Sequence, residues 1–402
     1  MARGVNEILT DRRTLDWGKK IAVLEPQAYP LLAWGTTIGK ENAVNQKFIN
    51  FEDRPYARWF YVGTITGAGP LTGLKLEIVE NDAAYAVAGA YVKARDTLYC
   101  PAKDHTMLVT AVNAGTGEID VTGLYAGQGD LTNADGRIHD VDDVTSDAHA
   151  DPADGDRIIH ISNVYPDGGN AGTPHALPLT EVFNFIQKMQ TPYDVDRELM
   201  LAELEGGPEL KRLQARKAIE HAKGQELQFL LGDRDARTNA AGKMVYTTAG
   251  LAHMGLTTDT VTTANFNEVA FRSFLRNLFA DEMNKRKLLI CGGQIVEAID
   301  AWAMGRLVIN DELSSVLGMK VPTYMTSFGT VDIVYHPLLI NSFEGWAFGL
   351  DPEQIKVKTY GGDTVLETAI QANDAQERLD EYRTSFGLKL GLIECHRWLK
   401  VT

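Results

Sequence analysis

The segment from residue 208 to 231, PELKRLQARKAIEHAKGQELQFLL, constrains the fold of this chain more than any other part of its sequence. Gly206-Gly207 end a preceding helical pattern at about 194 to 205, and Pro208 suits the first position of a new helix, where an N–H has no partner to lose. About 24 residues follow without another proline, which corresponds to roughly 36 Å at 1.5 Å per residue. The apolar residues fall on more than one face of this helix, so we expect it to contact several neighbours: Leu210, Leu213, Ile219, Leu227, Leu230 and Leu231.

The region before this helix, from about 46 to 180, has a different texture. It contains seven short β-type runs separated by Gly-rich punctuation: KFINFED, ARWFYVGTIT, LKLEIVE, TLYCPA, TMLVTAV, GEIDVTGLY and DRIIHISNVYP. Runs of this length and spacing predict hairpins or a small β-domain. The run LTEVFNFIQKMQ at 179 to 190 is compatible with either a strand or a helix.

The region after the helix predicts mixed α/β structure. Asn265 can cap a helix that leads into the strand LLIC, Gly292-Gly293 then open a second helix, and a long β run closes the chain. The run TSFGTVDIVYHPLL at 326 to 339 predicts a strand that ends at His-Pro because proline has no N–H to donate. No carboxylate or nucleophile lies at a spacing that links His336 to His396, so His336 is interpreted as framework.

Charge and cysteine content exclude several classes of protein. The formal net charge of −15 disfavours nucleic-acid binding, and nine Asp against one Arg lie in the Gly- and Asp-rich segment 128 to 156. The first residues lack the apolar core of a secretory signal, and no run reaches the roughly 18 apolar residues that span a bilayer. Three widely separated cysteines argue against disulfides and thiolate zinc sites. We therefore expect a protein made in the cytoplasm, with no membrane partner.

Catalytic and metal-binding patterns are not found in the sequence. There is no HExxH or GxSxG motif, and GAGPLTG at 67 to 73 fits a hairpin turn better than a phosphate loop. A calcium loop around Gly136 fails because Leu131 stands at its first position and Asp142 at its twelfth. No catalytic, cofactor or metal site is predicted. The alternative enzyme hypothesis is a metal-assisted hydrolase that uses Asp140, Asp142 and Asp143.

Contacts between subunits are the functional residues that the sequence does suggest. The run EDRPYARWFYV at 52 to 62 places Arg54, Arg58 and Trp59 close together, and Arg and Trp are enriched at protein interfaces. Residues 1 to 45 hold too few apolar residues for a core of their own, so Trp17 and Trp34 are expected to pack on something else. We predict that these five residues are inter-subunit contacts.

The order of these segments resembles the major capsid proteins of tailed bacteriophages, with the Hong Kong 97-type fold, in the subgroup with a short N-arm and an enlarged E-loop. The resemblance covers about residues 90 to 402 and rests on these stretches: FNFIQKMQTPYDVD, KAIEHAKGQELQFLLGDRDA, TAGLAHMG, TSFGTVDIVYHPLL, GWAFGLDPEQIKVKTY and SFGLKLGLIECHRWLKVT. It implies an α+β fold with five parts: an N-terminal arm (1–45), an E-loop with an inserted β-domain (46–180), a P-domain with the spine helix 208–231 (181–247), an A-domain of mixed sheet and helices (248–345), and a strand-rich return (346–402).

The resemblance also implies a function. The chain would be a non-enzymatic head protein that self-assembles into pentamers and hexamers, and these would form the icosahedral shell around the double-stranded DNA of a tailed phage. The DNA would be contacted weakly and without sequence specificity. Only about 45 residues precede the E-loop, so a separate scaffolding protein is expected, together with a portal, and a decoration protein is a further candidate partner. The Lys–Asn crosslink of some relatives cannot be placed in this sequence. The alternative is another phage structural protein: a decoration, tail-tube or surface-array subunit.

Overall fold

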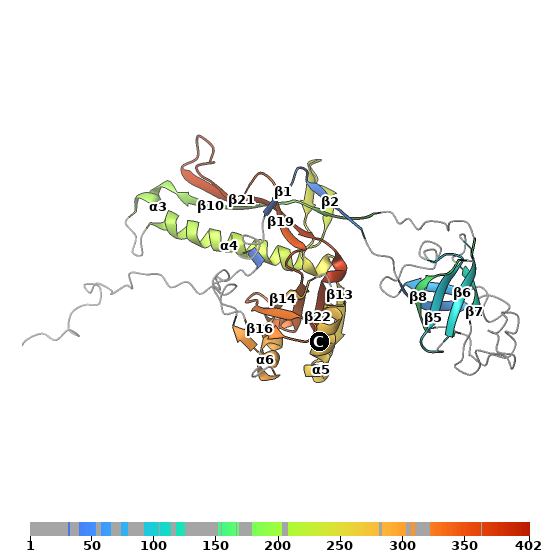
Figure 1. Cartoon of the computed structure of the whole chain (residues 1–402). Coiled ribbons are helices and arrows are strands. Elements are labelled where there is room, and N and C mark those ends of the chain that lie inside the picture. The colour runs from blue at the N-terminus through green and yellow to red at the C-terminus, as the bar shows by residue number, and fades with distance from the viewer. Residues whose placement is uncertain are drawn as a thin grey trace, which may run out of the picture. The chain divides into compact units, whose positions relative to one another are not determined.

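The computed structural model of the chain is shown in Figure 1. The residues that the structure describes are 31–32, 40–53, 58–65, 74–78, 92–103, 105–113, 118–124, 152–153, 155–165, 167–168, 179–202, 208–280, 284–302, 307–309, 322–362 and 364–402. They belong to two compact units, one formed by 1–52 with 181–402 and the other by 53–180.

The predicted long helix is present as α4 (Glu209–Leu231), directly after Pro208. It ends where the N–H of Gly232 donates to the carbonyl of Gln228. Its buried residues mix polar and apolar side chains: His221, Gln225, Glu226, Phe229 and Leu230. This mixture explains why the apolar positions alone did not define one face. The helix packs along β10 and β21 (Figure 1).

A five-stranded sheet accompanies this helix. Its strand order is β1 (Lys40–Asn42), β19 (Ile355–Thr359), β21 (Glu377–Leu390) and β10 (Gln187–Asp196), and β20 (Val365–Glu367) also pairs with β21. The ambiguous run 179–190 is therefore strand, divided between β9 (Thr180–Phe185) and β10. β9 pairs with β2 (Lys47–Glu52) in a separate two-stranded sheet. Pro192 is tolerated in β10 because β10 is an edge strand.

A seven-stranded sheet forms the other large layer of the same unit. Its order is β13 (Thr257–Val261), β22 (Arg397–Val401), β18 (Trp346–Leu350), β14 (Arg286–Cys291), β17 (Thr330–Tyr335), β16 (Pro322–Met325) and β15 (Leu307–Ile309). The strands alternate between two cores. Leu288 and Ile290 of β14 pack in a core with Phe229 and Leu230 of α4, whereas Leu289 packs in a second core with the two helices described next.

Two amphipathic helices cover the second core. They are α5 (Glu268–Leu278) and α6 (Gly293–Trp302), both near the predicted positions. The predicted cap at Asn265 is wrong by two residues. The side chain of Asn267 accepts from the N–H of Ala270 at 2.9 Å and caps α5, whereas Asn265 belongs to a short 3-10 turn that ends just before it.

The shorter elements of this unit connect the layers. They are α3 (Arg197–Leu201), β11 (Asp235–Thr238), β12 (Met244–Thr247), and the 3-10 turns η4 (Leu251–His253), η5 (Thr263–Asn265), η6 (Asn341–Phe343) and η7 (Ile393–Cys395). The turn η7 interrupts what the sequence suggested was one continuous closing β run, so β21 and β22 are separate strands in different sheets.

The second unit contains a closed six-stranded antiparallel barrel. Around the barrel the strands are β3 (Trp59–Ile65), β4 (Leu74–Ile78), β7 (Glu118–Leu124), β6 (His105–Val112), β5 (Asp96–Cys100) and β8 (Arg157–Asn163). Its interior is apolar, with Phe60, Leu98, Met107 and Ile158 fully buried. Closure leaves no unpaired strand edge, which stabilises a small β-domain. Six of the seven predicted β runs form this barrel.

The predicted α+β class is thus confirmed, and the parts implied by the Hong Kong 97-type resemblance are present: the β-rich insertion, the long helix and the mixed sheet with helices. Strand β2, which the sequence grouped with the insertion, pairs outside the barrel. Among the described residues, no helix combines the length and apolar character needed to cross a membrane.

Candidate assembly surfaces and the arm-docking site

Two of the five predicted contact residues lie in the described part of the chain. Trp59 begins β3 and is 46% exposed, whereas its neighbour Phe60 is fully buried in the barrel. Arg58 is exposed, and its backbone carbonyl accepts from the N–H of His160 at 2.7 Å. Trp17, Trp34 and Arg54 lie outside the described residues. The structure therefore leaves the side chains of Arg58 and Trp59 available on the outside of the barrel.

Apolar side chains continue from Trp59 across the barrel wall. Trp59 is paired with Ile159 of β8, which is paired in turn with Tyr99 of β5. Ile161, two residues beyond Ile159, is 47% exposed. Directly paired residues share a face, so Trp59 and Ile159 lie together on the outer wall, and Ile161 is exposed where the register between β5 and β8 shifts. Trp59, Ile159 and Ile161 are here called the barrel patch. The isoleucines of the run RIIHISN indicate this patch in the sequence, and the sequence analysis did not single them out.

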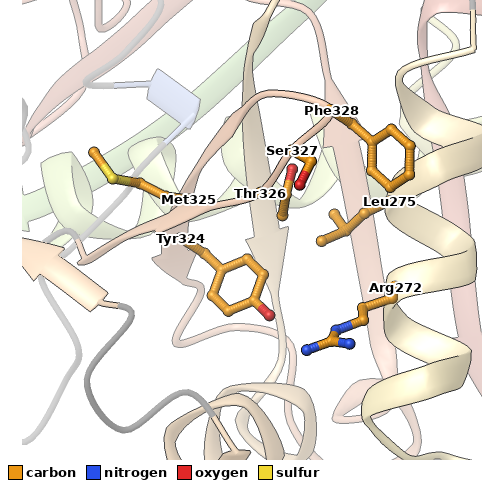
Figure 2. Close-up of a pocket in the computed structure, with 7 residues that line it drawn as sticks. All are labelled: Arg272, Leu275, Tyr324, Met325, Thr326, Ser327 and Phe328. Carbon is orange, nitrogen blue, oxygen red and sulfur yellow. The ribbon is translucent and has the colours of Figure 1, made fainter.

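A pocket of about 540 Å³ lies in the other unit, between α5 and the turn that joins β16 to β17 (Figure 2). Its lining combines polar and apolar side chains, of which Met325 and Phe328 are exposed and Leu275 and Tyr324 are buried. The lining residues are Arg272, Leu275, Tyr324, Met325, Thr326, Ser327 and Phe328. Arg272 pairs with Glu268 at 2.5 Å on the same helix. Among the described residues that line it, none is a carboxylate, an imidazole or a thiol.

A buried polar site is centred on Glu226 of α4, whose side chain is fully buried. One carboxylate oxygen accepts from the N–H of Leu31 at 2.7 Å, and the other accepts from the N–H of Leu32 at 2.8 Å. The imidazole Nε2 of His336, at the end of β17, lies 2.8 Å from the first oxygen. Glu226 thus joins three parts of the chain that are far apart in the sequence: residues 31–32, the long helix and the end of β17 in the seven-stranded sheet.

The hydrogen bond to the second ring nitrogen of His336 determines which nitrogen carries the proton. The N–H of Leu338 donates to Nδ1 at 3.2 Å, so Nδ1 is an acceptor and the proton of the neutral ring is on Nε2, from which it is donated to Glu226. The interpretation of His336 as framework agrees with this geometry. Sequence reasoning missed its partner Glu226, because no local pattern links two residues 110 positions apart.

A second polar site holds the arm where β1 joins the five-stranded sheet. The carboxylate of Glu41 lies 2.6 Å from the amine of Lys356, 2.5 Å from that of Lys358 and 3.5 Å from that of Lys389. Hydrogen bonds from Lys356 and Lys358 lower the pKa of Glu41 to about 2. Lys356 and Lys389 are directly opposed on neighbouring strands, so Glu41 neutralises a pair of like charges.

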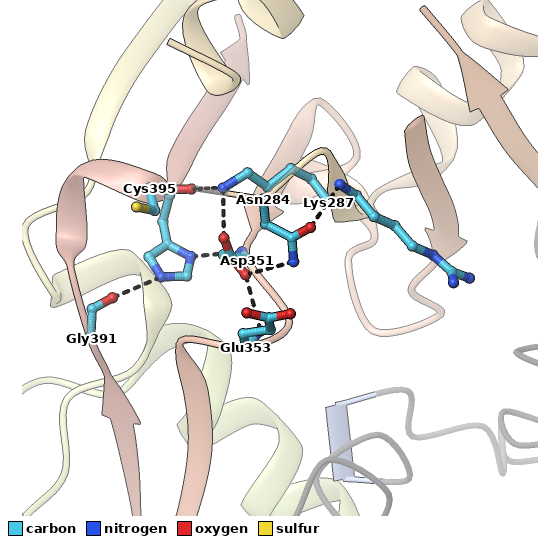
Figure 3. Close-up of polar contacts among 8 residues, drawn as sticks. Asn284, Lys287, Asp351, Glu353, Gly391 and Cys395 are labelled. Atoms are coloured by element: carbon cyan, nitrogen blue, oxygen red, sulfur yellow. Dashed lines mark hydrogen bonds and ion pairs between the residues drawn. The ribbon is translucent and has the colours of Figure 1, made fainter. Parts of the chain in front are cut away.

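A buried ion pair ties the strands of the seven-stranded sheet to η7 (Figure 3). The amine of Lys287 donates to Asp351 at 2.8 Å and to the carbonyl of Cys395 at 3.2 Å, and both charged side chains are 1% exposed. The ring of His396 accepts from the N–H of Asp351 at 3.1 Å and contacts the carbonyl of Gly391 at 3.1 Å. Burial lowers the pKa of His396 to about 4, so this ring is neutral.

Metal binding finds no support in the described ranges, where no three His, Cys, Asp or Glu side chains are grouped closely enough to hold an ion. Asp140, Asp142 and Asp143, on which the hydrolase hypothesis depended, lie outside the described residues. The three cysteines are free and buried, and burial raises the pKa of Cys100 and Cys291. Inert buried thiols of this kind are not nucleophiles.

Comparison with known proteins gives three kinds of result. No curated protein sequence matches the chain. Among solved structures, the capsid of Myoviridae phage XM1 is similar at 14% identity, covering 59% of this chain and 81% of that one, with a TM-score of 0.41. The capsid of cyanophage P-SCSP1u is similar at 10% identity over 60% and 80%, with a TM-score of 0.37. Mycobacterium phage Patience gives 10% over 60% and 77%, with a TM-score of 0.38.

The family comparison covers nearly the whole chain. The model of the family described as SU10 major capsid protein matches residues 5–402, which include both compact units and every described element. This chain belongs to the SU10 major capsid protein family.

Proposed function

We propose that the chain tiles the head shell of a tailed phage as pentamers and hexamers, enclosing double-stranded DNA that it contacts only weakly. The observation that carries the proposal is the family match over residues 5–402, which makes the chain a major capsid protein and hence part of the virion. Its production in the host cytoplasm, and the scaffolding, portal and decoration proteins, follow from the resemblance to tailed-phage capsids and are part of the proposal.

The arrangement of surfaces supports the proposal. Subunits that close into rings use heterologous contacts, so different patches of one subunit must meet each other. The barrel patch and the pocket beside α5 are two such patches with different chemistry. We assign Arg58 and Trp59 to the contacts made by the barrel, and we keep Trp17, Trp34 and Arg54 as proposed contacts.

The proposed division of the chain follows the sheets. We place the arm at 1–45, the E-loop with its β insertion at 46–180, the P-domain at 181–247, the A-domain at 248–345 and the return at 346–402. The pairing supports a return that serves both sheets, because β18 and β22 join the seven-stranded sheet whereas β19 and β21 join the five-stranded one.

The test is to express the full chain, alone and with a candidate scaffolding protein, and to image the product by negative-stain and cryo-electron microscopy. Closed particles of tens of nanometres with five- and six-fold capsomers are expected. Tubes or flat arrays would instead support a tail-tube or surface-array subunit, and a chain that stays monomeric under all conditions would overturn the proposal. Hydrolytic activity that is lost on chelation and restored by metal would contradict a purely structural role.

A further inference from the structure

The arm is attached to its own unit at two points of opposite polarity. At the first, here called the inner anchor, the N–H groups of Leu31 and Leu32 meet the carboxylate of Glu226. At the second, here called the outer latch, the carboxylate of Glu41 meets the amines of three lysines. The arm therefore presents donors at one end and an acceptor at the other, and its receptor is complementary to both.

The inner anchor resists release because it is buried. Leu31 is 3% exposed and packs in the core that also holds Phe229 and Leu339. Withdrawal of the arm would leave the fully buried carboxylate of Glu226 with only His336 of these three partners, and an uncompensated buried charge costs several kcal/mol. Salt does little to such a contact, because buried charges are screened much less than exposed ones.

The outer latch has the opposite properties. β1 adds only three residues, in parallel register, to the edge of β19. The side chains of Glu41, Lys356 and Lys389 are 29%, 39% and 24% exposed, so ions can reach them. Without Glu41, Lys356 and Lys389 would face each other directly, and like charges in opposed positions destabilise a sheet. Salt screens both the attraction between Glu41 and the lysines and the repulsion between the lysines. The contribution of Glu41 to holding β1 in place therefore decreases as ionic strength rises.

We propose that the lysine-bearing face of β19 and β21 is a reversible binding site for an acidic strand, occupied here by the chain's own β1. High ionic strength shifts β1 toward release from this site, while the inner anchor keeps the arm attached at Leu31. The arm is then a strap with one fixed end and one end that opens. This inference does not rest on shell formation, because release of β1 is a property of the single subunit.

Amide hydrogen exchange of the full chain tests the proposal. The N–H of Ala43 donates to the carbonyl of Thr359 at 2.8 Å and reports on the latch, whereas the N–H groups of Leu31 and Leu32 report on the anchor. Between about 0.05 M and about 1 M NaCl, where the screening length falls to about 3 Å, exchange at Ala43 should accelerate about fivefold. Exchange at Leu31 and Leu32 should not change.

Three variants sharpen the test. Glu41→Gln should accelerate exchange at Ala43 in low salt and remove most of its salt dependence. Glu353→Gln, at an exposed glutamate in the turn before β19, should change neither and serves as the matched control. Glu226→Gln should expose the N–H groups of Leu31 and Leu32 to exchange, which checks the anchor independently.

Several results would overturn the proposal. If the exchange rate at Ala43 changes neither with salt nor in Glu41→Gln, the outer latch does not exist. If salt accelerates exchange at Ala43 and Leu31 together, the inner anchor is not a fixed end. Protection of Ala43 that falls on dilution of the protein would show that a second copy supplies the strand, contrary to the assignment of the chain's own β1. None of these results depends on whether shells form.

Discussion

The imidazole Nε2 of His336 lies 2.8 Å from a carboxylate oxygen of Glu226, and both side chains are fully buried. One residue ends a strand of the seven-stranded sheet, and the other lies near the end of the long helix. Their contact fixes the sheet against the helix, and the arm completes the site by donating two N–H groups to the same carboxylate. A single charged group thus determines where three parts of the fold meet.

Glu226→Gln should lower the free energy of unfolding by about 3 kcal/mol, because the amide group that replaces one carboxylate oxygen cannot accept from both N–H groups and the ring. Urea denaturation of the full chain measures the loss. Glu220→Gln on the same helix is the matched control, since Glu220 is exposed and pairs with Lys217 at the surface. It should change stability by less than about 0.5 kcal/mol. Equal effects of the two variants would mean that the buried site does not anchor the fold.

Much of the fold could be predicted from sequence because its signals are local. Pro208 and an uninterrupted stretch without proline predict α4, and alternation between Gly-rich turns predicts the barrel strands. The same local rules did not resolve 179–190, whose apolar spacing suits both periods. The strand form prevails because both halves of the run find distant partners: β9 pairs with β2, and β10 pairs along its ten residues with β21.

The polar sites could not be predicted in the same way. Glu226, His336 and Leu31 carry no shared motif, and the lysines of the outer latch look like ordinary surface charges until β19, β21 and β1 are side by side. Such sites depend on tertiary pairing, so one sequence contains no period or spacing that indicates them. Trp59, by contrast, was proposed from the sequence as a contact residue because Arg and aromatic residues are adjacent there in the chain itself, and that contact stays a prediction.

Acid should destabilise the protein in a window set by His396. Burial lowers the pKa of this ring from 6.5 to about 4 in the folded chain. Between these values the unfolded chain binds more protons, so the free energy of unfolding falls as the pH decreases from 6.5 and the loss is complete near 4. His396 alone should account for up to about 3 kcal/mol. Burial also lowers the pKa of His221, which acts in the same direction.

Urea titrations at a series of pH values between 4 and 7 measure this dependence. His396→Gln should flatten the curve, although the variant is less stable at neutral pH because a flexible amide replaces the rigid buried ring that accepts from the N–H of Asp351. An unchanged slope in the variant would show that His396 is not the group responsible. The pKa of Glu41 is lowered from 4.5 to about 2 in the folded chain, so the stability that the outer latch contributes is lost only as the pH falls below about 4.5.

Gly250→Ala should destabilise the chain by about 3 kcal/mol through a backbone collision. A Cβ at this position would lie 2.5 Å from the carbonyl oxygen of Gln228 and 2.8 Å from the nitrogen of Gly232, at the end of α4. Backbone atoms cannot move aside as a flexible side chain can. Gly293→Ala is the matched control, since its Cβ would meet only the ring of Tyr335 at 3.8 Å. Thermal melting compares the two, and similar melting temperatures would contradict the predicted collision.

Trp59→Ala should separate assembly from folding. Trp59 points outward from the barrel at 46% exposure, so its truncation should change the stability of the subunit by no more than about 0.5 kcal/mol. If it anchors a contact with a neighbouring subunit, each lost contact costs about 2 kcal/mol or more, as aromatic anchors do at interfaces. Over the many contacts of a shell this should prevent closed particles, which light scattering and negative-stain microscopy detect.

Two variants of the same barrel make the result specific to that surface. Phe60→Ala creates a cavity at a fully buried position one residue away and should lower the free energy of unfolding by about 3 to 5 kcal/mol. This subunit should therefore misfold before it can assemble. Thr110→Ala, at an exposed site on β6, should leave both folding and assembly intact. A Trp59→Ala subunit that folds and still forms normal shells would remove Trp59 from the proposed contacts, whereas one that folds and stays unassembled would place the barrel wall between subunits.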